Sequence, residues 1–494
     1  MQRFSLHRLV APFVFALAGV LTTGCSVPLG PGYRIEKQNF ELHFIRSPEP
    51  HLAVRCTYQL LNSGNQPLES LRILVPAAGA FHRSTTSAEW NGQSIAVRTV
   101  SAASSSDRGD TIELHLPTPW AAKQKRAFVL GYELSTGAHL GSDLAVSPAT
   151  FFAFPESWNP TLLPQKHLLS TGGGPPKKWN LSVRVPAGFL VHASGVPAKR
   201  ASSGGEWVYS FRQQPGEFAP FAAGGNYVER EVRASGDRIL FWTLQPVDPA
   251  ASENAATSVV SRARYYESEY GSPSESARTI RLLECIIPSN SFGCGALPGT
   301  VLVQPASIAG GLKDKASLDD MNFELASTWF GGVSRVRFDE SPLPMDAVAP
   351  YAGWEAEAYE DGANARAARV QSLLSDFDKR STECKEKVLL PLPPGESGCS
   401  YSPAWTKSAL FFFALEDRIG RAQFHRSLKY MIQARRGADF RLEDLVSALE
   451  SESHQPQGQF VRQWLKYPGI PDGFRARYAR AVAPAANHSE EPHP

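Results

Sequence analysis

The chain has 494 residues, with 50 Lys and Arg against 48 Asp and Glu, so its formal net charge at neutral pH is +2. This balance lacks the basic field that nucleic-acid binding requires, and we predict no nucleic-acid partner. Hydrophobic residues make up 42% of the chain and charged residues 20%, which excludes a disordered protein and suffices for the cores of two or three domains.

The N-terminus has the pattern of an export signal. Two arginines precede an apolar run over 9–21, which is too short to span a membrane. The run leads into Thr22-Thr-Gly-Cys25, which resembles a bacterial lipobox, the motif whose cysteine is lipidated and becomes the mature N-terminus. We therefore predict a signal over 1–25, a lipid bilayer as partner through Cys25, and the outer membrane facing the periplasm as location, because Ser26 follows. A cleaved signal peptide without lipid is the alternative.

The six cysteines fit an oxidising compartment. Cys285 and Cys294 flank one short loop, and Cys384 and Cys399 flank another, so each pair is a candidate disulfide. Cys56 would then be a buried free thiol on a strand. Spacing alone does not prove connectivity, and a cysteine metal site is the alternative.

Residues 26–245 are predicted to form a β-rich domain. Apolar side chains alternate with other residues over 52–60, 71–75, 112–116 and 179–185, which is the period of a strand with one buried face. Turn residues separate these runs, so in isolation this half predicts only an all-β sandwich.

Apolar residues at helical spacing begin near Ser252. Further stretches of this kind follow within the second predicted domain, over 246–475. Within this part, 279–288 and 293–303 are strand candidates. Ser317 and Asp320 form an S-x-x-D capping box, which predicts a helix that carries Met321 to Trp329. Residues 476–494 are predicted to be a disordered tail.

That helix contains Glu324-Leu-Ala326 and Trp329-Phe-Gly331. This frame resembles the zinc-binding helix of the membrane alanyl aminopeptidase family, the gluzincin aminopeptidases, which carries His-Glu-Leu-Ala-His-x-Trp-(Phe/Trp)-Gly. Further segments resemble the family's β-saddle, its Tyr-x-Lys-Gly-Ala helix and its closing Phe-x-x-Trp-Leu-x-x-Pro-Gly-x-Pro motif: Val183–Gly188, Phe218–Tyr227, Trp405–Gly420 and Phe460–Pro471. The resemblance implies a mixed α and β fold, with an N-terminal β-saddle or sandwich followed by a thermolysin-like α+β peptidase-type domain over 246–475.

The resemblance also implies a zinc site, but its ligand positions are replaced. In the family two histidines at i and i+4 and a glutamate on a later helix hold zinc, and the glutamate between the histidines is the general base. Phe323 and Ser327 stand at the histidine positions, and Trp354 stands at the third position. Glu324 keeps the vestigial general-base position. A phenyl ring has no donor atom and a serine hydroxyl is a poor zinc ligand, so we expect no metal or other cofactor.

The expected substrate cleft departs from the family in the same way. The family often carries Gly-x-Met-Glu-Asn there, and its glutamate binds the free amine of the substrate. The matching segment here consists of Gly295, Ala296, Leu297, Pro298 and Gly299, without a carboxylate.

The oxyanion-stabilising tyrosine of the family is replaced by Trp405, and Tyr401 would substitute only by a shifted register. Glu355 and Glu357 are displaced alternatives for the third ligand, although they point to different helix faces. No histidine lies between His192 and His425, so a local histidine site cannot form in this segment.

Three functions remain open at this point. The first is a membrane-anchored periplasmic lipoprotein that is a catalytically inactive pseudo-peptidase and binds peptides or partner proteins. The alternative is an active metallo-aminopeptidase whose metal site, with zinc, is rebuilt around Glu324, Glu355 or Glu357. The second alternative is a purely structural envelope lipoprotein.

Overall fold

The computed structural model describes residues 32–480 apart from several internal segments: 77–81, 102–108, 137–143, 164–177, 214–219, 274–278, 286–295, 298, 331–334, 337–346, 385–387, 390–400, 437–438 and 441. The predicted signal, Cys25 and the end of the predicted tail lie outside the described residues. So do Cys294, Cys399, Gly295 and Pro298.

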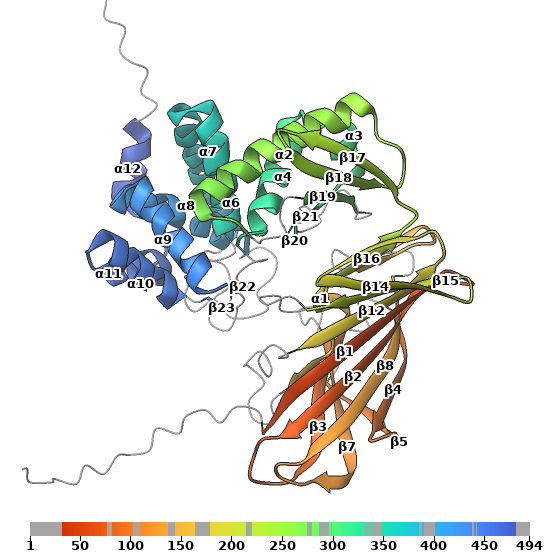
Figure 1. Cartoon of the computed structure of the whole chain (residues 1–494). Coiled ribbons are helices and arrows are strands. Elements are labelled where there is room, and N and C mark those ends of the chain that lie inside the picture. Colours follow the sequence, from red (N-terminus) through yellow and green to blue (C-terminus); the bar gives the residue numbers. More distant parts are fainter. Residues whose placement is uncertain are drawn as a thin grey trace, which may run out of the picture. The chain divides into compact units, whose positions relative to one another are not determined.

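The N-terminal part consists of sheets (Figure 1). Within the described residues, the largest sheet has eight strands in the order β14 (Val196–Ser203), β15 (Glu206–Arg212), β12 (Trp179–Pro186), β1 (Tyr33–Ile45), β2 (His51–Asn62), β8 (Lys125–Ser135), β4 (His82–Trp90) and β5 (Gln93–Ile95). A second sheet has the order β11 (Thr161–Leu163), β3 (Leu68–Pro76), β7 (Gly109–Trp120) and β6 (Val97–Ser101). A third has the order β13 (Leu190–Ala193), β16 (Ala222–Gly225), β10 (Thr150–Ala153) and β9 (Leu144–Val146), and the short helix α1 (Pro155–Trp158) follows β10.

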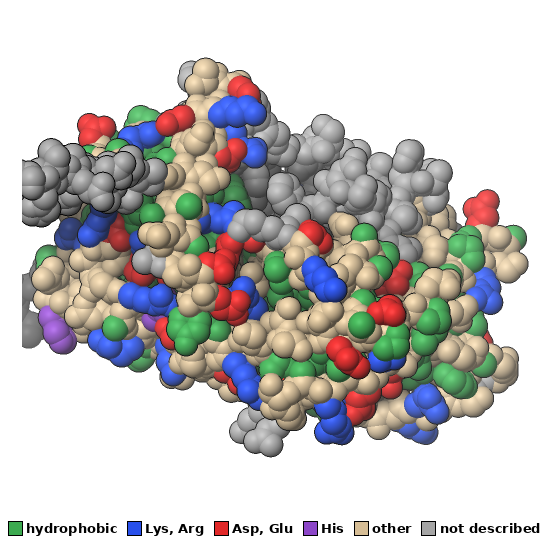
Figure 2. All heavy atoms as spheres, turned by 90° about the horizontal axis from the view of Figure 1, so that it is seen from above, with side chains coloured by type: hydrophobic (Ala, Val, Ile, Leu, Met, Phe, Trp, Pro, Cys, Tyr) green, Lys and Arg blue, Asp and Glu red, His purple; other side chains and the backbone are tan. Residues whose placement is uncertain are grey.

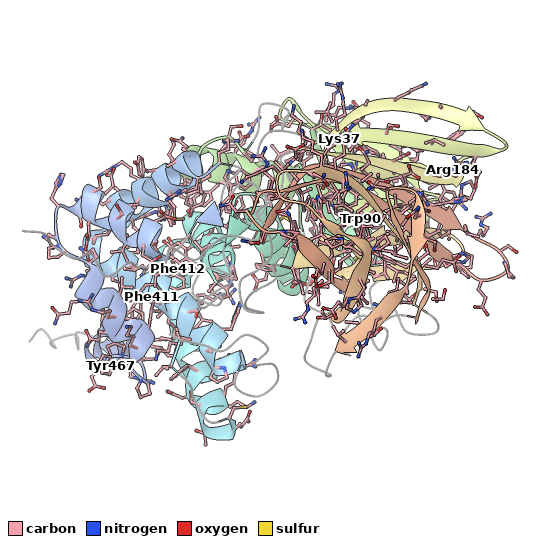
Figure 3. All side chains as sticks on the ribbon, turned by 90° about the horizontal axis from the view of Figure 1, so that it is seen from below. Lys37, Trp90, Arg184, Phe411, Phe412 and Tyr467 are labelled. Atoms are coloured by element: carbon pink, nitrogen blue, oxygen red, sulfur yellow. The ribbon has the colours of Figure 1, made fainter. Side chains whose placement is uncertain are left out.

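The strand alternation seen in the sequence produces the core of this part. On β2, Leu52, Val54, Cys56, Tyr58 and Leu60 are buried, whereas the residues between them are half-buried or exposed. Because successive side chains of a strand point to opposite faces, one face of β2 enters the core. Trp90, labelled in Figure 3, belongs to the same core cluster.

The C-terminal part combines a sheet with helices (Figure 1). Its sheet has the order β17 (Val228–Ala234), β18 (Asp237–Thr243), β19 (Thr279–Glu284), β21 (Thr300–Val303) and β20 (Ala296–Leu297). The described helices are α2 (Pro249–Tyr270), α3 (Pro305–Ala309), α4 (Lys315–Ser327), α6 (Val348–Asp361), α7 (Ala363–Glu383), α8 (Tyr401–Ile419), α9 (Arg421–Ala434), α10 (Leu442–Ser453), α11 (Gly458–Lys466) and α12 (Asp472–Arg480). A two-stranded pair joins β22 (Arg335–Val336) to β23 (Asp439–Phe440).

Two strands pair across the predicted domain boundary near 245. Strands β17 and β18 precede that boundary, yet β18 pairs in parallel with β19, so both strands belong to the sheet of the C-terminal part. Strand β18 is a continuous apolar run that is buried on both faces, but pairing across the intervening helix α2 leaves no local mark in the sequence.

Two predicted helix ends also need correction. The N-cap of α4 is Asp314 rather than Ser317: its side chain accepts a hydrogen bond from the Ser317 backbone N–H at 2.8 Å, a cap that stabilises a helix by about 1 kcal/mol. The predicted tail begins too early, because α12 continues to Arg480 and buries Tyr478 against the core.

The described cysteines divide into two kinds. Cys285 and Cys384 are each in a disulfide, whereas Cys56 is a free thiol, buried on β2. The predicted partners Cys294 and Cys399 lie outside the described residues, so the two pairings stay predictions.

In the part of the chain that the structure describes, no helix is long and apolar enough to cross a membrane. Figure 2 shows one face of the molecule, on which acidic and basic side chains are mixed among the described residues.

Candidate functional site

Helix α4 carries both positions at which the family has histidines. Phe323 is half-buried and packs against the core of the C-terminal part. Ser327 lies one turn later, and its Oγ donates a hydrogen bond to the Phe323 carbonyl oxygen at 3.0 Å. The serine hydroxyl is therefore bonded within its own helix, and the phenyl ring offers no atom to a metal.

Helix α6 approaches α4 closely at Gly353. A Cβ atom at Gly353 would lie 3.4 Å from the Asn322 Cβ atom and 3.4 Å from the Phe323 backbone nitrogen. A Cβ atom there would be in van der Waals contact with α4, so the backbones of the two helices lie side by side at Gly353. The next residue, Trp354, stands at the third ligand position.

Trp354 belongs to a cluster that we call the aromatic block: Trp354, Trp405 and Phe413. The rings of Trp354 and Trp405 meet edge to face, with centroids 5.9 Å apart and an interplanar angle of 84°. Phe413 stacks on Trp354 at 6.3 Å and 16°. Aromatic pairs of these geometries stabilise by about 0.5–1.5 kcal/mol beyond area burial. The third ligand position and the oxyanion position therefore carry tryptophans that pack against each other.

An arginine that the sequence analysis missed covers this block. The Arg369 guanidinium carbon lies 5.3 Å from the Trp354 ring centroid. The same guanidinium pairs with Glu357 at 2.8 Å and with Asp319 at 2.9 Å. Because Asp319 belongs to α4, Glu357 to α6 and Arg369 to α7, one side chain ties three helices together. No local motif marks Arg369, since its partners are distant in sequence or on another helix.

The other displaced carboxylate, Glu355, has no exposed surface. Its Oε1 accepts a hydrogen bond from Arg366 Nε at 3.1 Å, and its Oε2 lies 3.5 Å from Arg421 Nη1. Burial, and then the charge of Glu416, raise the pKa of Glu355 to about 7 in spite of both arginines. Glu355 and Glu357 thus lie on different faces of α6, and arginines hold both.

Glu324 is 4% exposed and lines a small pocket between α4 and the end of β21. The pocket is also lined by Leu302, Val303, Gln304, Ser307, Ser317, Asp320 and Met321. Its free volume is about 10 Å³, which is room for about one water molecule. A peptide does not fit into a space of that size.

The described residues do not fit a zinc ion. The three ligand positions hold Phe323, Ser327 and Trp354, without an imidazole or a carboxylate. Within the described ranges, no group of three or more His, Cys, Asp or Glu side chains is placed to hold a metal. Tyr401 begins α8, but its side chain lies outside the described residues, and so does Pro298.

No protein-family model and no curated protein matches the sequence. Solved structures do match it. An M1 zinc metallopeptidase from Deinococcus radiodurans is 17% identical, with a TM-score of 0.58, and the match covers 89% of this chain and 95% of that one. A mutant M1 zinc metallopeptidase from the same organism, bound to a Tyr-Ser-Ala substrate, has a TM-score of 0.60 at 17% identity, over 89% of this chain and 96% of that chain.

Native yeast LTA4 hydrolase has a TM-score of 0.63 at 13% identity, over 89% of this chain and 69% of that one. Identities this low show the fold alone. The mixed α and β fold expected from the resemblance is confirmed: the chain has a sheet-rich N-terminal part and a helical C-terminal part, the architecture of M1 zinc metallopeptidases.

Proposed function

We propose that the protein is a pseudo-peptidase, a membrane-anchored lipoprotein of the cell envelope that binds peptides or partner proteins with an aminopeptidase-like fold. The observation that supports this is the aromatic block. Trp354 and Trp405 pack edge to face at the positions of a metal ligand and of an oxyanion stabiliser. A site without an imidazole or carboxylate to hold zinc lacks the Lewis acid and the activated water of the metallopeptidase reaction.

Peptides are the ligand class that we propose first. A solved structure of the same fold holds a Tyr-Ser-Ala substrate, and a fold can keep a binding function when its chemistry is lost. The pocket beside Glu324 has room for about one water molecule. A bound peptide would therefore lie outside this pocket.

The test is elemental analysis of the purified full chain together with an aminopeptidase assay on the tripeptide Tyr-Ser-Ala. We expect no stoichiometric zinc and an intact tripeptide, with or without Glu324→Gln. Stoichiometric zinc together with turnover that Glu324→Gln abolishes would overturn the proposal in favour of an active metallo-aminopeptidase.

The anchor is tested separately. Cys25→Ala should leave the protein unlipidated and move it from the membrane fraction to the soluble fraction. Ser26→Ala, which keeps the cysteine, is the matched control. If the Cys25→Ala protein still fractionates with membranes, a lipid-only anchor is wrong.

A further inference from the structure

Strand β19 carries a half-buried arginine, Arg281, whose charge has no carboxylate partner among the described residues. Its Nε is buried and makes no hydrogen bond. Other buried arginines are paired: Arg83 contacts Asp110 at 2.8 Å, and Arg262 contacts Glu360 at 2.7 Å. Because a buried charge without a counter-charge is costly, an anion is expected close to Arg281.

Neutral groups hold the Arg281 guanidinium in place. Its central carbon lies 4.8 Å from the ring centroid of Trp242 on β18. Its Nη1 donates a hydrogen bond at 3.0 Å to Nδ1 of His192, which belongs to β13, and lies 3.5 Å from the hydroxyl oxygen of Thr300 on β21. The guanidinium is therefore fixed between an indole, an imidazole and a hydroxyl.

The protons in this cluster show that His192 is neutral. A guanidinium only donates hydrogen bonds, so His192 Nδ1 must accept, and the ring proton belongs to Nε2. Nε2 lies 2.8 Å from Thr300 Oγ1 and donates to it. Burial, and then the charge of Arg281, hold the pKa of His192 well below its ordinary value. The cluster therefore carries the single positive charge of Arg281.

The charged neighbours of Arg281 offset this charge only in part. Burial lowers the pKa of Arg281 to about 10, the charge of Glu229 opposes this shift, and that of Arg238 adds to it. Glu229 Oε2 accepts a hydrogen bond from Trp242 Nε1 at 2.6 Å, and Arg238 already pairs with Glu231 at 2.7 Å. An anion that reached Arg281 would therefore meet a desolvated cation, where electrostatic attraction is strong.

Arg281 lies beside the segment predicted as the substrate cleft. Its backbone N–H donates a hydrogen bond to the Gly299 carbonyl oxygen at 2.9 Å. Arg281 pairs with Thr300, which in turn pairs with Leu297, across the neighbouring strands β19, β21 and β20 (Figure 1). Leu297 and Gly299 belong to the cleft segment, which has no charged residue. This segment offers no carboxylate to an ammonium group, whereas Arg281 offers N–H donors to an anion.

We propose that Arg281 binds a carboxylate group of the peptide ligand, an inference that rests on the peptide binding proposed above. Its Nη2 makes no hydrogen bond to a described residue, so this nitrogen is the donor for the ligand. Charge-assisted hydrogen bonds from arginine to carboxylates are roughly twice as strong as neutral ones. The ligand is then recognised by its negative group.

The test is calorimetric titration of the purified full chain with the tripeptide Tyr-Ser-Ala and with its C-terminal amide. The acid should bind roughly tenfold to a hundredfold more tightly than the amide, because the amide loses a hydrogen bond to a charged group. Arg281→Met should abolish this preference and leave the affinity for the amide within about twofold of the parent. Tyr-Ser-Glu amide distinguishes the two sources of a carboxylate: tight binding assigns the side chain, and weak binding assigns the C-terminus.

The matched control is Arg238→Met, which removes a nearby cation that is already paired with Glu231. It should change the affinity for Tyr-Ser-Ala by less than about threefold, since an exposed paired charge contributes little. If the parent binds the acid and the amide equally, the inference about Arg281 is wrong, although peptide binding stands. An equal loss in the Arg281 and Arg238 variants would mean that only the general field attracts the peptide, which also overturns the inference.

If neither tripeptide binds, peptide binding fails, and N-acetylalanine decides the carboxylate site by itself. At millimolar concentration it should raise the Tm of the parent chain more than N-acetylalaninamide does, because a ligand that binds the folded state stabilises it. The comparison uses the parent chain, so it does not depend on how Arg281→Met folds. Equal Tm values with the acid and the amide would overturn the site.

Discussion

Two adjoining faces of helix α6 differ in chemistry: Trp354 lies three residues after Tyr351, and Phe413 packs on both rings. On one face Trp354 packs against Trp405 and Phe413, where the fold's metallopeptidases are expected to place a metal ligand. On the other face Tyr351 and Glu355 enter buried networks of histidine, carboxylates and arginines. The third ligand position therefore carries an aromatic ring, whereas the polar groups on the adjoining face join helices.

The comparison shows that the two faces differ in how much stability is lost when one side chain of a contact is removed. Each aromatic contact adds a modest and separable stabilisation. Buried ion pairs add little net stability over apolar packing, but removal of one partner leaves an uncompensated charge. We therefore expect single substitutions to be most damaging on the charged face and less damaging on the aromatic face.

The largest effect is expected for Arg366→Met. This guanidinium contacts Glu355, Glu416 and Asp417 at 3.0–3.2 Å, and the change should lower the free energy of unfolding by about 3–5 kcal/mol, since the buried Glu416 loses its arginine and Glu355 keeps only Arg421. Urea unfolding at neutral pH measures it.

Its control is Arg426→Met on α9, where an exposed arginine pairs with Glu452 and the expected loss is below about 1 kcal/mol. Equal losses for both variants would mean that the charged face is no more sensitive than the surface.

The next effect is that of Trp354→Ala. Loss of the ring removes the contacts with Trp405, Phe413 and Arg369, and should cost about 3 kcal/mol, the low end for a large core aromatic, because Trp354 is only half-buried. Urea unfolding compares it with Trp207→Ala on β15, a half-buried tryptophan under Arg200. A Trp354 variant as stable as the parent would contradict a packing role for the aromatic block.

The third prediction concerns how the stability of the Glu355→Gln variant depends on pH, relative to that of the parent. A carboxyl group whose folded-state pKa is raised to about 7 makes stability fall as the pH rises from about 4.3, the unfolded value, to about 7. Gln cannot ionise, so the variant should match the parent near the acid end of this window and exceed it by roughly 3–4 kcal/mol above neutral pH.

Thermal unfolding across this pH range, with the exposed-site variant Glu452→Gln as control, measures the difference. If Glu355→Gln is destabilised above neutral pH, the ionised carboxylate is stabilising there and the sign of our argument is reversed.

The smallest change in function is expected for Phe323→His combined with Ser327→His. Two imidazoles would then share one face of α4, but Trp354 still supplies no third ligand, so aminopeptidase turnover should stay at background. Adding Trp354→Glu should bring stoichiometric zinc, as measured by elemental analysis, without restoring the replaced oxyanion group. Turnover by the double variant alone would reveal a third ligand elsewhere in the chain.

Much of the fold could be read from local pattern. The two-residue period predicted β2, β7 and β12, and the frame around Glu324 predicted helix α4 and the architecture to which it belongs. Such features depend on neighbours in the sequence, whose spacing determines which face a side chain occupies. The same frame also shows which residues replace the two histidines, because Phe323 and Ser327 are read directly from the sequence.

What the sequence by itself determined, then, is the class of fold and the identity of the residues at each expected ligand position. Only the tertiary structure determined which partners the buried polar and charged side chains contact. Arg369 ties α4, α6 and α7, and His425 meets a glutamate 156 residues away. Pairings over such distances follow from how helices pack, and helix packing is set by the summed burial of many side chains, which leaves no local spacing for a sequence to show.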